Sequence, residues 1–230
     1  MATAERAQET RRGWLSTLFG LPFQIMAVLV VSLLMSVLIE WAGIYWQWWS
    51  QPGAQHALET LEAEVARLDT TFTRSLLVSD PVALATGSVG RAYDWLFVRS
   101  GISAWLETSA HHGGWLGTLH VYVQAALYVT LMTLTRVVIL LLTSPLFALA
   151  ALVGFVDGLV RRDLRRFGAG RESAFIYHHA KRAITPVFVV GWLLYLSVPF
   201  AIHPNAFLLP CAALFGLLVS IATGSFKKYL

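Results

Sequence analysis

Apolar runs long enough to cross a lipid bilayer restrict this chain to a membrane fold. A crossing needs roughly 20 apolar residues. Only 13% of the chain is charged, whereas soluble proteins carry about 25%. The expected transmembrane helices are residues 19–39, 137–156, 184–202 and 206–223. The sequence therefore predicts an all-α integral membrane protein with four transmembrane helices.

The stretch from Trp115 to Val156 is almost continuously apolar, with Arg136 in the middle. Two crossings within it would return the following basic loop to the outer side, against the charge bias of the chain. One long helix resolves the conflict. Its first half would pack on outer helices, and its second half, residues 137–156, would cross the membrane with a kink at Pro145.

The basic residues are concentrated on one side of the predicted spans. Residues 157–183 contain seven of the 17 Lys and Arg, whereas residues 40–135 contain four Arg and eight acids. Short loops rich in Lys and Arg stay in the cytoplasm. We therefore expect residues 1–18, 157–183 and 224–230 to be cytoplasmic, so that both termini lie inside. Residues 40–136 would form a periplasmic helical region.

Two helices are expected in that region. From His56 to Leu77 apolar residues recur at steps of three and four, with Glu59, Glu62 and Glu64 assigned to the other faces. Asp80 followed by Pro81 is a typical helix start. The second helix is expected to run from there to Trp105, with a break at Gly87 or Gly90. The apolar stripe of the first helix would pack against the second.

Two further features predict contacts between helices. Glu40 and Arg136 are expected at the same depth, and they would pair because an unpaired charge near hydrocarbon is costly. In the last span small residues recur in steps of four, which lets another helix approach closely. This packing ridge consists of Ala212, Gly216, Ser220 and Gly224. It would pack within the chain or dock onto another subunit.

The basic loop is the candidate binding surface. Arg161 and Arg165, like Arg162 and Arg166, are i,i+4 neighbours on one helix. Four like charges on adjacent strips favour an acidic partner, either anionic lipid headgroups or an acidic protein surface. The candidate contact residues are Arg161, Arg162, Arg165, Arg166, Arg171, Phe175 and Tyr177.

No catalytic, cofactor-binding or metal-binding residues are predicted. Gly168–Gly170 lacks the Lys of a phosphate-binding loop. His178 and His179 have no acid or cysteine at ligand spacing. Two alternatives remain at this point. One is a small transporter or channel, although no carboxylate lies inside a span. The other is a membrane enzyme that uses His178 and His179.

Three blocks of the sequence resemble a known family. They read VDGLVRRDLRRFGAGRESAFIYHHAKR, TPVFVVGWLLYLSVPFAIHPN and SFKKYL. They are similar to inner-membrane proteins of integrating conjugative elements, which resemble the TraJ-type partner of TraD/TraG-type coupling proteins. The resemblance covers residues 133–230 closely.

This resemblance implies a non-enzymatic subunit of conjugative DNA transfer by a type IV secretion system. Such a subunit would lie in the bacterial inner membrane beside the hexameric coupling ATPase. We do not expect direct DNA binding, and formation of a homo-oligomer is left open.

Overall fold

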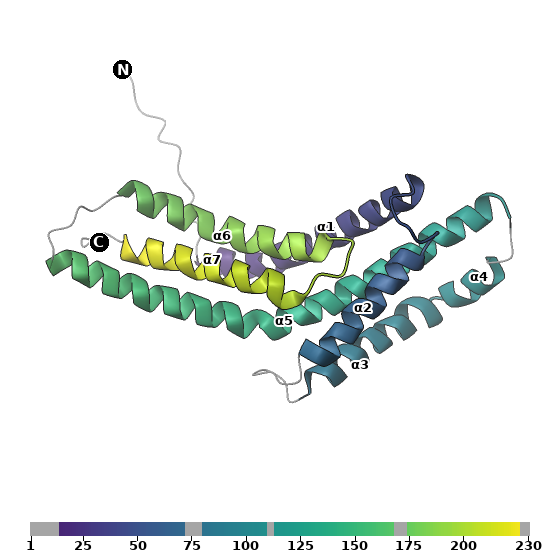
Figure 1. Ribbon diagram of the computed structural model, residues 1–230, viewed down its shortest axis with the longest axis horizontal. Coiled ribbons are helices and arrows are strands. Elements are labelled where there is room, and N and C mark those ends of the chain that lie inside the picture. The colour runs from purple at the N-terminus through teal and green to yellow at the C-terminus, as the bar shows by residue number, and fades with distance from the viewer. Residues whose placement is uncertain (1–13, 72–79, 110–112, 168–173, 226–230) are drawn as a thin grey trace, which may run out of the picture.

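The computed structural model describes residues 14–71, 80–109, 113–167 and 174–225, and the regular structure in these ranges is entirely helical (Figure 1). The elements are α1 (Trp14–Tyr45), α2 (Gln55–Thr71), α3 (Pro81–Tyr93), the π-helical turn η1 (Asp94–Val98), α4 (Ile102–Ser109), α5 (Trp115–Phe167), α6 (Ala174–Ser197) and α7 (Pro204–Gly224). The predicted all-α class is therefore confirmed.

The expected long helix is also confirmed, and it continues through the clustered arginines to Phe167. α5 is a single helix of 53 residues, which corresponds to a length of about 80 Å. Pro145 lies inside it and has no N–H for the carbonyl of Leu141. The hydroxyl of Ser144 donates to that carbonyl at 2.7 Å instead. α5 changes direction near its middle (Figure 1).

The other helices form two groups along α5 (Figure 1). The apolar bundle consists of α1, the second half of α5, α6 and α7. The side layer consists of α2, α3, η1 and α4, which lie along the first half of α5. α7 packs mainly on α5 and then on α6, whereas α2 packs mainly on α5. The apolar stripe of α2 therefore faces mainly α5. The sequence had predicted packing against the second side-layer helix, which is only a minor contact of α2.

The start of the second side-layer helix was predicted correctly, and its break was not. The carboxylate of Asp80 accepts a hydrogen bond from the backbone N–H of Ala83 at 2.9 Å. The helix continues through Gly87 and Gly90 and passes into η1. The chain turns at Gly101, whose φ of 76° suits a residue without a side chain. The break falls at Gly101 because this turn, unlike the helical positions, requires a left-handed residue.

Three described helices are long and apolar enough to cross a membrane: α1 from Phe23, α5 and α7. α6 differs from the expected span of residues 184–202. It ends at Ser197, and residues 198–203 are not helical. Lys181 and Arg182 occupy its first half, which leaves a short apolar section.

α1 exposes most of its large apolar side chains, and its fully buried residues are small or polar. Ser32, Ser36 and Glu40, spaced by four residues, are at most 1% exposed. They form one face of the helix, which packs against α5 and α6. On the opposite side Phe23 is 78% exposed and Leu34 56% exposed. This pattern is typical of a helix whose outer face contacts lipid, because lipid tails impose no penalty on exposed apolar groups.

The packing ridge of α7 lies against α5 within the same chain. All four of its residues are buried. A Cβ added at Gly154 would lie 2.1 Å from the carbonyl oxygen of Gly216, and one added at Gly216 would lie 2.7 Å from that of Ala150. Gly158 is equally close to Ser220. Glycines on both helices thus bring the two backbones into direct contact.

We predict that Gly154→Ala destabilises the bundle by about 1–3 kcal/mol, because the added methyl group forces α5 and α7 apart. The matched control is Gly90→Ala, since a Cβ at Gly90 meets nothing within 4 Å. That change should stabilise α3 by about 0.5–1 kcal/mol, since alanine favours helix over glycine. Thermal unfolding in detergent measures both. Equal responses of the two variants would contradict the close α5–α7 contact.

Candidate functional site: a buried arginine network and a basic helix end

Arg136, in the middle of α5, is completely buried and pairs with a residue of the side layer. Its Nη2 atom lies 2.9 Å from Oε1 of Glu64, and its Nε atom lies 3.2 Å from the same oxygen. Both side chains are 0% exposed. Because Glu64 belongs to α2, this ion pair fixes the side layer to α5.

The same guanidinium group also binds the end of α6. Its Nη1 atom donates to the backbone oxygens of Tyr195 at 3.1 Å and Leu196 at 3.4 Å. It donates to that of Val198 as well. Nη2 donates to the carbonyl of Phe200 at 2.9 Å. The last carbonyls of a helix have no partners within it. Arg136 supplies these partners, and its charge is favourable at a helix C-terminus.

The aromatic ring of Tyr195 completes the enclosure, with the guanidinium carbon 5.7 Å from its centroid. Burial raises the pKa of the Glu64 carboxyl group, and the neighbouring Arg136 opposes this effect. Arg136 is therefore the neighbouring charge that favours the ionised form of the buried Glu64 carboxyl group. Removing one partner of such a buried pair typically costs about 3–5 kcal/mol.

The predicted pairing of Glu40 with Arg136 is wrong, because each residue has another partner. The carboxylate of Glu40 lies 3.0 Å from Nδ1 of His56 at the start of α2. The indole of Trp49 stacks on the His56 ring with centroids 3.9 Å apart. Gly43 makes room for that indole, since a Cβ there would lie 1.9 Å from it. The turn from α1 into α2 thus returns His56 to Glu40, whereas Arg136 faces the next turns of α2.

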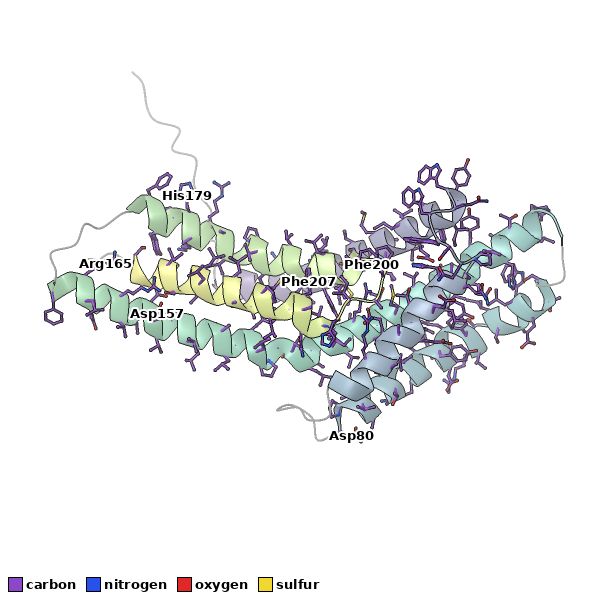
Figure 2. The ribbon with its side chains drawn as sticks, viewed as in Figure 1. Asp80, Asp157, Arg165, His179, Phe200 and Phe207 are labelled. Carbon is purple, nitrogen blue, oxygen red and sulfur yellow. The ribbon has the colours of Figure 1, made fainter. Side chains whose placement is uncertain are left out.

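The basic residues of the candidate binding surface gather at the far end of the bundle from the side layer. Figure 2 shows Asp157, Arg165 and His179 at this end, which is formed by the end of α5 and the start of α6. Arg161 pairs with Asp157 at 2.9 Å, and Asp157 accepts a hydrogen bond from Ser220 of α7. Arg161 therefore has an acidic partner on its own helix.

The other predicted contact residues differ in exposure. Arg162, Arg165 and Tyr177 are half-buried, whereas Phe175 is 71% exposed. The side chain of Arg166, together with Arg171 and Gly168–Gly170, lies outside the described residues. We name the surface formed by the described residues Arg161, Arg162, Arg165, Phe175 and Tyr177 the basic end.

The histidine pair does not assemble a reactive site in the described structure. His178 and His179 are both exposed, and Nδ1 of His179 lies 2.8 Å from the carbonyl of Phe175. Within the described ranges, no three His, Cys, Asp or Glu side chains lie close enough to hold a metal ion. The charged groups at this end are placed for binding and positioning.

The sequence contained a signal for Glu64 that was misread. Glu64 lies three residues after Leu61 and one before Val65, so it borders the buried stripe of α2 rather than another face. An acid at that position beside an apolar stripe indicates a buried partner of opposite charge. The carbonyl ligands of Arg136 give no comparable signal, since every residue carries a carbonyl.

We predict that Glu64→Gln destabilises the protein by about 3–5 kcal/mol, because it leaves the charge of Arg136 buried without a counterion. Glu62→Gln is the matched control, since Glu62 is exposed on the same helix. It should change stability by less than about 0.5 kcal/mol. Thermal unfolding and the amount of inserted protein measure both variants. Indistinguishable stabilities for the two would contradict a charged, buried pair.

A comparison with protein families identifies the chain. The model of the family "IncC plasmid conjugative DNA transfer protein DtrJ-like" matches residues 48–227. No curated protein and no solved structure shows significant similarity to the chain. The family match includes the side layer, the arginine network and the basic end. It extends the resemblance detected over residues 133–230 toward the N-terminus. The chain belongs to the DtrJ-like family of conjugative DNA transfer proteins.

Proposed function

We propose that this protein is a non-enzymatic inner-membrane subunit of a conjugative type IV secretion system and that it associates with the coupling ATPase. Membership of the DtrJ-like family, over residues 48–227, is the observation that carries the proposal, since it assigns the chain to conjugative DNA transfer. The apolar outer faces of α1, α5 and α7 support a position in a membrane.

Four crossings are proposed, with α6 as the third. α6 and α7 lie side by side and pack on each other (Figure 1). The helical part of α6 is short, but non-helical backbone is tolerated at membrane depth where it is buried in protein and its polar groups are bonded. Residues 198–203 meet this condition in part, because the carbonyls of Val198 and Phe200 accept hydrogen bonds from Arg136.

The proposed orientation has the basic end in the cytoplasm and the side layer in the periplasm. The distribution of charge supports it, because short loops rich in Lys and Arg are retained inside. The aromatic side chains of Tyr45, Trp46 and Trp48 lie at the C-terminal end of α1 and are 60–72% exposed. Exposed Trp and Tyr are typical of a membrane interface.

The basic end is the proposed contact surface for the ATPase. Arg162 and Arg165 are two cations on consecutive turns of α5. Large apolar side chains flank them, with Phe167 91% exposed and Phe175 71% exposed. Exposed aromatic residues beside arginines are typical of the residues that dominate protein interfaces. An acidic surface with an apolar centre on the ATPase would complement this end.

We predict that the side layer and the basic end lie on opposite sides of the membrane. A reporter enzyme that is active only in the periplasm should be active when fused after Gly53 or Gly113. It should be inactive when fused after Phe167 or Leu230, since these positions follow basic segments. Activity after Phe167, with the protein correctly inserted, would contradict the proposed orientation.

We further predict that replacing Arg161, Arg162, Arg165 and Arg166 with Gln reduces co-purification of the ATPase at least about tenfold, because charge-complementary contacts are lost. The protein is purified from conjugating cells in mild detergent, and the ATPase is quantified by mass spectrometry. The reporter fusion after Leu230 shows whether the variant still inserts correctly.

Arg91→Gln combined with Arg99→Gln is the control for loss of charge, since both residues are exposed in the side layer. This control should retain the ATPase. A second variant, Phe167→Ser with Phe175→Ser, removes the apolar groups and leaves the charge unchanged. Full retention of the ATPase by both the four-arginine variant and the Phe variant would rule out the basic end as its docking surface.

A further inference from the structure

A pocket between α5, α6 and α7 combines two cations with an apolar wall at the basic end of the bundle. Its volume is about 400 Å³. The residues that line it are Phe155, Leu159, Arg162, Tyr177, Lys181, Ala222 and Thr223. The two cations come from different helices, Arg162 from α5 and Lys181 from α6. The bundle itself therefore brings them together.

The polar part of the pocket suits a phosphate group. A guanidinium group binds phosphate through two parallel hydrogen bonds, and an ammonium group adds a point charge. The Nζ atom of Lys181 lies 5.7 Å from the ring centroid of Tyr177, so the aromatic face helps to hold the ammonium group over the pocket. The nearby carboxylate of Asp157 is engaged by Arg161 and Ser220, and it is not among the residues that line the pocket.

The apolar part of the pocket suits an acyl chain. Phe155 is 48% exposed and Leu159 36% exposed, and both lie on α5 before Arg162. The order along α5 is therefore an apolar surface followed by a cation. A phospholipid has the same order, with its chains in the hydrocarbon layer and its phosphate at the surface. Basic pockets between transmembrane helices on the cytoplasmic side recognise such headgroups.

We propose that this pocket binds the headgroup of one anionic phospholipid, with Arg162 and Lys181 on the phosphate and with Phe155 and Leu159 along an acyl chain. The proposal rests on the proposed crossing of the membrane by these helices and is independent of the ATPase. A lipid in this position would join the ends of α5 and α6, and α7 forms the third wall.

The test uses purified full-length protein in mild detergent and titrates phosphatidylglycerol, with phosphatidylcholine as the zwitterionic comparison of zero net charge. Native mass spectrometry counts bound lipids. One phosphatidylglycerol should bind in preference to phosphatidylcholine. Arg162→Gln with Lys181→Gln should weaken this binding about 30-fold, roughly fivefold for each cation at the membrane surface.

The matched control is Arg161→Gln with Arg165→Gln, which removes the same charge from the same end. These residues line a different pocket, between α5 and the end of α7, and they are not among the residues that line the proposed lipid pocket. The affinity of the control variant for phosphatidylglycerol should stay within about twofold of that of the unchanged protein, because Arg161 and Arg165 do not line the proposed phosphate site. Equal losses in the two double variants would show that the attraction is diffuse and would overturn the site. No loss in either variant would overturn it as well.

Two further measurements distinguish loss of the site from misfolding and lipid binding from binding of a soluble anion. Lys181→Gln alone changes an exposed residue, so it tests the site even if the double variant does not fold. It should weaken binding roughly fivefold. Glycerol phosphate carries a phosphate group without acyl chains and should not compete at equal concentration. Competition by glycerol phosphate would identify a soluble anion site instead and would contradict the lipid assignment.

Discussion

A guanidinium group that is removed from water is tolerated only when its N–H groups find acceptors, and all three nitrogens of Arg136 do so. Its ligands come from two parts of the chain that are distant in sequence. One is Glu64 on α2, and the other is a set of backbone carbonyls from Tyr195 to Phe200. One side chain of α5 thus connects the side layer to the end of α6. The carbonyls from Tyr195 to Phe200 also need hydrogen-bond donors in an apolar environment. Arg136 and the segment between α6 and α7 therefore stabilise each other.

The apolar bundle is stabilised by contacts that differ from those of a soluble protein. α1 buries Ser32 and Ser36 and exposes most of its large apolar residues. α5 and α7 meet through glycines at a backbone distance that leaves no room for a Cβ at Gly154. Both features are expected where lipid removes the hydrophobic driving force between helices, so that close packing has to replace it. Together they give a bundle with an apolar exterior that ends in a basic surface.

Much of this fold could be predicted from the sequence because the signals are local. The continuous apolar stretch from Trp115 predicted the single helix α5, and Asp80 with Pro81 predicted the start of α3. The partner of Arg136 could not be predicted from depth alone. Glu40 was expected at the same depth as Arg136, but the turn after α1 brings His56 to Glu40. The early end of α6 was missed for a related reason, since it depends on carbonyl acceptors that Arg136 satisfies from another helix.

The candidate site, like the fold, could be predicted from the sequence only in part. The ridge of small residues in α7 was readable from its spacing, whereas its counterparts Gly154 and Gly158 were identified only once α5 and α7 were seen together. Clustered arginines were evident in sequence, but the pocket that joins Arg162 to Lys181 requires the packing of three helices. Spacing along one helix is periodic and visible in sequence, whereas contacts between helices depend on their relative rotation.

Hydrogen–deuterium exchange of Arg136→Gln against the unchanged protein tests most directly whether one side chain holds the two parts together. Loss of the guanidinium group should speed exchange in two separate segments, α2 around Glu64 and residues 198–203, because both lose the same partner. Arg91→Gln, at an exposed position of the side layer, should change neither segment. Faster exchange in only one of the two segments, or in neither, would contradict the role assigned to Arg136.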